Sequence, residues 1–115
     1  MILVLFKLPC LQFKLTEWFK GAESFALRDG YLYTGVQGGE IIRLDLMTDD
    51  PRSVKESSWQ KVGKIGKECN TIIHEEMCGR PLGLAFDVDG YLLVADSFYG
   101  LYRLDIHTGK MLNYS

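Results

Sequence analysis

An internal repeat restricts the possible folds of this chain more than any other feature of the sequence. Residues 29–46 and 89–106 align without a gap at an offset of 60 residues. Both segments begin with Asp-Gly-Tyr-Leu, at Asp29 and Asp89, and both contain Arg-Leu-Asp near their end. The similarity continues upstream, between residues 21–27 and 80–86, with a shift of one position. Such self-similarity indicates two copies of one structural unit.

Each copy of the repeat has the residue pattern of short β-strands separated by tight turns. In the first copy we expect strands at 23–27, 31–36, 40–46 and 59–65, and in the second at 82–86, 91–95, 101–106 and from residue 110 onward. An Asp-Gly pair precedes the second strand of each copy and supplies the positive φ angle that hairpin turns require. Four antiparallel strands per repeat predict an all-β fold made of β-propeller blades.

The repeat also divides the chain into expected parts. Residues 1–20 form an N-terminal apolar segment with an outer strand that closes the last blade, and residues 21–66 form blade 1. Residues 67–79 link the blades, and residues 80–115 form a truncated blade 2. A ring needs about four to eight blades. We therefore expect the chain to belong to a longer protein or to be a truncated product.

Composition narrows the classes of function. The formal net charge is −2, with 13 Lys and Arg against 15 Asp and Glu, so binding to nucleic acid has no electrostatic support. No apolar run approaches the roughly 18–20 residues that cross a bilayer. The first eight residues, MILVLFKL, are compatible with an incomplete signal or anchor, with an apolar strand, or with an arbitrary start of the chain.

The three cysteines are Cys10, Cys69 and Cys78. The spacing of the last two allows either a disulfide bond or two free thiols, and it does not fit the closely spaced cysteine pairs of zinc sites. Cys10 is left as the odd cysteine.

Two segments, GAESFALRDGYLYTGVQGGEIIRLD and CGRPLGLAFDVDGYLLVADSFYGLYRLD, resemble the strictosidine synthase-like family, in particular its animal branch of adipocyte plasma membrane-associated protein and hemomucin. The resemblance covers residues 18–115. It implies an incomplete six-bladed β-propeller, of which this chain is the first two four-stranded antiparallel blades. It also implies a disulfide between Cys69 and Cys78, and hence the secretory pathway, meaning the endoplasmic reticulum lumen, the cell surface or the extracellular space.

The resemblance further implies a metal site. In related paraoxonase-type propellers a glutamate of the first innermost strand binds calcium in the central channel, and Glu23 stands at that position. Family members usually have Gly-Pro-Glu-Ser where this chain has Gly-Ala-Glu-Ser. A carboxylate in a propeller channel is costly unless it is paired or bound to a cation. The alternative is a solvated carboxylate at the mouth of the channel.

Other polar residues have structural interpretations. Residues 87–90 lack the first ligand of a calcium-binding loop, so we expect a turn there. Asp96 is expected to cap the turn that follows it, and Arg80 to hold a neighbouring blade. Asn113 begins an N-glycosylation sequon. No catalytic residue is assigned, because the catalytic glutamate of true strictosidine synthases belongs to a later blade and the serines and histidines show no nucleophile–base spacing.

Three functions remain open. The resemblance implies a calcium-dependent hydrolase of the arylesterase or lactonase type, with a small-molecule ester or lactone as substrate. The alternative is a non-catalytic propeller that binds partners at the cell surface or in the endomembrane system, and a third is a cytosolic scaffold. None of them involves nucleic acid, and membrane association is expected only through an N-terminal anchor, if the full-length protein has one.

Overall fold

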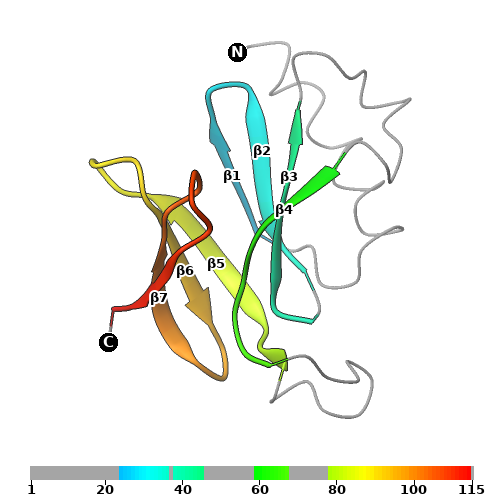
Figure 1. The fold of residues 1–115 in the computed structure, drawn as a ribbon, viewed down its shortest axis with the longest axis vertical. Coiled ribbons are helices and arrows are strands. Elements are labelled where there is room, and N and C mark those ends of the chain that lie inside the picture. The colour runs from blue at the N-terminus through cyan, green and yellow to red at the C-terminus, as the bar shows by residue number, and fades with distance from the viewer. Residues whose placement is uncertain (1–23, 37, 46–58, 68–77, 115) are drawn as a thin grey trace.

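The computed structural model describes residues 24–36, 38–45, 59–67 and 78–114, and these residues form two antiparallel sheets (Figure 1). The first sheet contains β1 (Phe25–Arg28), β2 (Tyr31–Gly35), β3 (Glu40–Asp45) and β4 (Trp59–Lys64). The second contains β5 (Pro81–Phe86), β6 (Leu92–Asp96), β7 (Gly100–Leu104) and β8 (Met111–Asn113).

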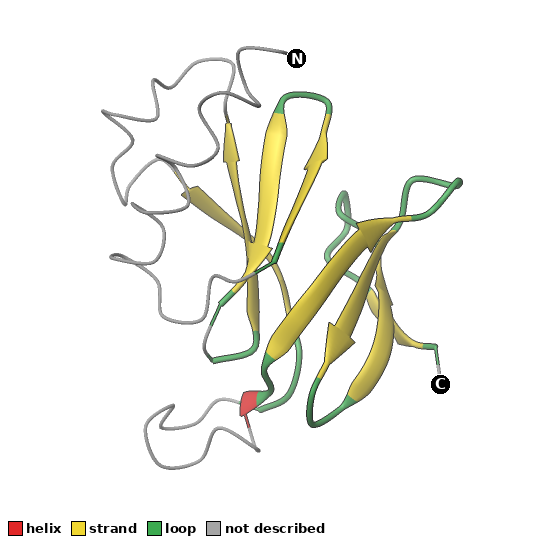
Figure 2. Cartoon of the chain, turned by 180° about the vertical axis from the view of Figure 1, so that it is seen from behind, coloured by secondary structure: helices red, strands yellow, loops and turns green. Residues whose placement is uncertain are grey.

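The order of the strands in each sheet follows their order in the chain. Each sheet is therefore a simple antiparallel meander, and the two sheets lie side by side as separate layers (Figure 2). The sequence-based prediction of two four-stranded antiparallel sheets is confirmed, and the strands begin and end within two residues of the expected positions. The domain boundaries proposed from the sequence, at residues 20, 66 and 79, stay predictions.

The two sheets pack face to face through one apolar layer. Tyr33 and Ile41 of the first sheet, 1% and 0% exposed, belong to the same buried cluster as Leu92, Val94 and Leu104 of the second. The layer also contains the ring of Phe86, which meets the Tyr33 ring edge-on at 5.1 Å between centroids. Burial of these side chains between the layers is the main force that holds the second sheet against the first.

Two glycines allow the sheets to approach each other closely. A Cβ atom on Gly35 would lie 2.6 Å from Cβ of Pro81, and one on Gly63 would lie 2.9 Å from Cδ1 of Leu104. Any larger residue at either position would push the sheets apart. β1 and β2 consequently contact β5 directly, so that β1 and β5 are neighbouring strands of the two sheets.

The first sheet is buried on both faces. Cross-strand register places Leu32 beside Leu44 and Thr34 beside Ile42, on the face turned away from the second sheet. All four side chains are fully buried, at 0% exposure. Alternate side chains of β3 therefore point to two faces that are both covered, and neither face is open to solvent.

The identical residues of the repeat have a common structural role. The guanidinium of Arg43 lies over the ring of Tyr31 at 4.5 Å, and that of Arg103 lies over the ring of Tyr91 at 3.7 Å. Each pair joins the start of the second strand of a sheet to its third strand. Cation–π contacts of this kind explain why both copies keep the same tyrosine and arginine.

Both Asp-Gly pairs lie in turns, as the sequence predicts, but the two turns differ in backbone conformation. In the first sheet Asp29 (φ 51°) and Gly30 (φ 82°) form a two-residue hairpin turn between Arg28 and Tyr31. In the second, Gly90 has a positive φ of 88° and Asp89 does not. The cause is the one-residue shift of the repeat, which places an additional residue before the second Asp-Gly pair. The turn between Phe86 and Leu92 is therefore longer, and it no longer needs two residues in the left-handed conformation.

Candidate functional site

The start of β1 is fixed by hydrogen bonds to both sheets. The Leu84 amide of β5 donates to Oγ of Ser24 at 3.2 Å. Within the first sheet, the buried Thr34 hydroxyl donates to the Ser24 carbonyl oxygen at 2.8 Å. Ser24 therefore holds the start of β1 in a fixed position relative to β5.

Glu23, the calcium ligand expected from the resemblance, immediately precedes Ser24 and lies outside the described residues. Its role stays a prediction. Sequence reasoning missed the parts played by Ser24 and Thr34 at the start of β1. A threonine among the apolar residues of a buried strand was the available signal for Thr34, because a buried hydroxyl needs a hydrogen-bond partner.

Asp96 is the last residue of β6. It lies at the same end of the two sheets as Ser24, and it is only 6% exposed. Its Oδ1 accepts hydrogen bonds from the amides of Phe98 at 2.8 Å and Tyr99 at 3.0 Å. These bonds confirm the prediction that Asp96 caps the turn after it. Its Oδ2 accepts no hydrogen bond from the described residues and lies 2.9 Å from the place that a Cβ on Gly79 would occupy, so the carboxylate packs against the glycine.

Cys78 lies beside this glycine at the junction of the two sheets. It is 1% exposed and disulfide-bonded. Cys78 is the only cysteine of the described part of the chain, so its partner lies outside that part, as Cys69 and Cys10 both do. The pairing of Cys69 with Cys78 stays a prediction.

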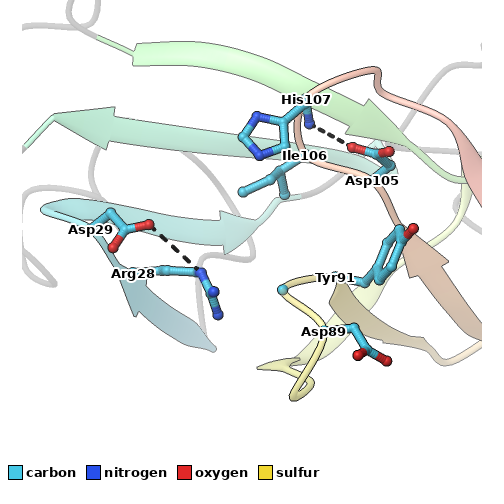
Figure 3. A pocket seen from close by; sticks show the side chains of 8 residues that line it. Arg28, Asp29, Asp89, Tyr91, Asp105, Ile106 and His107 are labelled. Carbon is cyan, nitrogen blue, oxygen red and sulfur yellow. Dashed lines mark hydrogen bonds and ion pairs between the residues drawn. The ribbon is translucent and has the colours of Figure 1, made fainter.

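A polar pocket of about 260 Å³ lies at the opposite end of the sheets, between the turns (Figure 3). Arg28 and Asp29 line it from the first sheet and pair at 3.7 Å. Asp105 lines it from the second sheet, where its Oδ1 accepts hydrogen bonds from the amides of His107 at 2.9 Å and Thr108 at 3.3 Å. The carboxylates of Asp29 and Asp105 thus take part in local contacts, and the described residues include no cluster of three or more metal-ligating side chains.

The pKa of Asp105 is lowered from 3.8, chiefly by the hydrogen bond from the His107 amide. The carboxylate is therefore ionised at neutral pH and holds the β7–β8 turn. This is a structural role.

Residues 87–90 form a turn, as the sequence predicted. Oδ1 of Asp87 accepts hydrogen bonds from the amides of Asp89 at 2.9 Å and Tyr91 at 3.0 Å, and the Asp87 carbonyl accepts one from Gly90. Oδ2 of Asp87 lies 3.7 Å from Nε of Arg103. Both carboxylate oxygens of Asp87 thus serve the local structure of the turn.

Two four-stranded meanders, consecutive in the chain and stacked face to face, define the class of structure as β-propeller blades. Comparison with known proteins specifies the family. Residues 20–44 match the family described as "Strictosidine synthase-like, N-terminal". The chain belongs to the strictosidine synthase-like family.

Individual relatives place the chain in the animal branch of this family. Adipocyte plasma membrane-associated protein Hemomucin of Drosophila melanogaster is 42% identical over 91 residues, 78% of this chain and 14% of the relative. Adipocyte plasma membrane-associated protein of Gallus gallus is 34% identical, over 78% of this chain and 20% of the relative. Strictosidine synthase-like 13 of Arabidopsis thaliana is 37% identical, over 60% of this chain and 19% of the relative. The chain thus spans one fifth or less of the length of these relatives.

Proposed function

We propose that this chain supplies the first two blades of a calcium-dependent hydrolase of the arylesterase or lactonase type, with a small-molecule ester or lactone as substrate. Glu23 is the calcium ligand that the first strand contributes. The observation that supports this most is the double anchoring of Ser24, by the Leu84 amide at 3.2 Å and the Thr34 hydroxyl at 2.8 Å. These bonds fix the chain at the residue that follows Glu23.

Calcium binds about six to eight oxygen atoms, and a bound metal ion polarises a substrate carbonyl. The described residues contain no group of three or more metal-ligating side chains. In this proposal the other oxygens come from later blades of the full-length protein. In this proposal the role of the chain is to supply one carboxylate from a rigidly held strand.

The proposed location is the secretory pathway or the cell surface. Two relatives are named plasma membrane-associated proteins, and the disulfide of Cys78 fits an oxidising compartment. The sequon residue Asn113 is exposed at the end of β8, which fits the proposed glycosylation there. The described residues contain no helix long and apolar enough to cross a membrane. Membrane association is proposed only through an N-terminal anchor, if the full-length protein has one.

The test uses the full-length protein with the substitution Glu23→Gln. Calcium should raise the melting temperature of the unsubstituted protein, since a ligand that binds only the folded state stabilises it. Chelation should abolish turnover of phenyl acetate. Glu23→Gln should weaken calcium binding at least tenfold and reduce turnover in parallel.

Glu40→Gln on β3 is the matched control, because it removes one carboxylate at the same end of the same sheet, from the third strand and not from the start of β1. It should leave calcium binding and turnover unchanged. Unchanged calcium binding in Glu23→Gln would exclude Glu23 as a ligand.

The alternative is a non-catalytic propeller that binds partners at the cell surface or in the endomembrane system. The names of the animal relatives favour it, since they mention membrane association and no reaction. A full-length protein that binds calcium through Glu23 but turns over neither aryl esters nor lactones would support this alternative.

A further inference from the structure

The second sheet ends at an outer strand that contains no charged residue. The strand order places β8 (Met111–Asn113) at the margin of this sheet, and no other described strand pairs with its outer side. The main-chain N–H and C=O groups along such an edge are a template for pairing with a strand of another molecule. Proteins commonly protect these edges with charged side chains, above all lysine. The residues of β8 are Met, Leu and Asn, so charge does not protect it.

The outer strand of the first sheet has the protection that β8 lacks. Cross-strand register places Ile42 beside Lys61 in the first sheet and Tyr102 beside Asn113 in the second. Ile42 and Tyr102 correspond to each other at the 60-residue offset of the repeat. Asn113 therefore occupies on β8 the position that an exposed lysine occupies on β4.

Asn113 is exposed and begins the sequence Asn-Tyr-Ser, the acceptor pattern for N-glycosylation. The amide of Tyr114 donates to the carbonyl oxygen of Leu101 at 2.8 Å, so the pairing with β7 continues beyond the end of β8. In an antiparallel pair the main-chain groups of successive residues point alternately toward and away from the partner strand. The main-chain groups of Asn113 thus point to the outer side of β8, and a glycan on this residue lies beside that edge.

From this equivalence we infer that Asn113 carries an N-linked glycan, and that the glycan protects the outer edge of β8 against pairing with strands of other molecules. The inference rests on the proposed passage of the protein through the secretory pathway. An N-linked glycan is bulky and hydrated. It therefore prevents another strand from approaching to about 4.8 Å, the spacing of paired strands. The glycan does on β8 what the charge of Lys61 does on β4.

The modification transfers an oligosaccharide from a lipid diphosphate, and a transferase of the endoplasmic reticulum catalyses it. The side-chain amide nitrogen of Asn113 forms a bond to the anomeric carbon of the first sugar. The bond between that carbon and a diphosphate oxygen breaks, and the lipid diphosphate leaves. The amide nitrogen loses one proton, and the step needs no oxidant or reductant.

A glycan on Asn113 does not involve the candidate calcium site. Ser24, at the start of β1, is hydrogen-bonded to Leu84 of β5, which is the first strand of the second sheet, whereas β8 is the last. The glycan and the start of β1 therefore lie at opposite margins of this sheet. Loss of the glycan should leave calcium binding through Glu23 unchanged.

The experiment compares the full-length protein, expressed in insect cells, with three variants. Ser115→Ala removes the acceptor pattern but keeps Asn113, and Ser115→Thr is the matched control because it keeps the pattern. Asn113→Lys replaces the glycan with the charge found on β4. Mass spectrometry of the tryptic peptide that begins at Met111 detects the glycan, and sedimentation velocity measures self-association.

We expect a glycan on Asn113 in the unsubstituted protein and in Ser115→Thr, and both should be monomeric. Ser115→Ala should lack the glycan and self-associate at a concentration at least about tenfold lower, because the edge of β8 is then open to pairing. Asn113→Lys should stay monomeric without a glycan. All variants should keep the circular dichroism spectrum of the unsubstituted protein.

The inference is overturned if the peptide is unmodified in protein that microsomes protect from added protease. It is also overturned if Ser115→Ala stays as monomeric as Ser115→Thr, or if Asn113→Lys self-associates as Ser115→Ala does. An unmodified peptide in protein found outside the microsomes overturns the inference together with the proposed location. The calcium site is tested separately, by Glu23→Gln.

Discussion

At the scale of single residues, Gly39 shows how strictly the junction of the two sheets limits the sequence. Gly39 has φ of 78°, and its carbonyl accepts a hydrogen bond from the Ile65 amide at 2.7 Å. A Cβ atom at this position would overlap the carbonyl oxygens of Cys78 and Ile65. Main-chain atoms cannot rotate away as a side chain can, so only glycine fits.

Gly39→Ala should therefore destabilise the fold far more than backbone strain alone would. Gly109→Ala is the matched control, because Gly109 has nearly the same φ, 77°, but the nearest atom to a Cβ there is 3.5 Å away. We expect a loss of about 1 kcal/mol for Gly109→Ala and of at least about 3 kcal/mol for Gly39→Ala. Urea unfolding measures both losses. Equal losses would show that the junction is not as close as the structure indicates.

Some residue roles could be predicted from the sequence and others could not. The cap made by Asp96 follows from a local pattern, an aspartate between a strand and a turn, and the structure confirms it. The bond between Ser24 and Leu84 joins residues that are 60 positions apart. No local pattern reports such a contact, because it depends on how the two sheets stack.

At the scale of elements, the β7–β8 connection depends on one ionised carboxylate. Asp105 accepts hydrogen bonds from two amides of this turn, and its main-chain carbonyl accepts one from Gly109 at 2.8 Å. The pKa of Asp105 is lowered from 3.8, with the His107 amide as the largest cause. The carboxylate is charged and stabilises the turn wherever the pH lies above its lowered pKa.

This shift predicts a pH dependence with a definite sign. Since the folded pKa of Asp105 is depressed, its contribution to stability is fully present above 3.8 and is lost as the pH falls through the lower folded value. Asp105→Asn removes this titration. We expect the melting temperature to fall less steeply below pH 3.8 in the variant, with a loss of stability at pH 6 that disappears in strong acid. A variant whose acid limb parallels that of the unsubstituted chain would contradict this role.

The strands were more predictable than the turns. Runs of β-forming residues bounded by glycine placed the strands correctly, because a half-buried strand needs those residue types. Identical Asp-Gly pairs form two different turns, because the repeat has one more residue before the Asp-Gly pair in the second copy than in the first. Gly90 keeps a positive φ of 88°, whereas Asp89 does not.

At the scale of the whole molecule, the sequence indicated two repeats but not which faces of the two sheets meet. In the first sheet both faces are apolar, with Leu32 and Ile42 on one side and Tyr33 and Ile41 on the other. The pattern of hydrophobic residues therefore does not distinguish them. Gly35 and Gly63 decide the question in the structure, because both lie on the face that Pro81 and Leu104 approach.

The stacking of two separate sheets is the central claim, and nuclear Overhauser contacts measured on the isotope-labelled chain test it most directly. The account predicts contacts between the rings of Tyr33 and Phe86, whose centroids lie 5.1 Å apart, and between the Leu104 methyl groups and the α-protons of Gly63. It predicts no backbone contacts of a strand ladder between β4 and β5. Ladder contacts between these two strands would show one continuous sheet or barrel and would contradict the account.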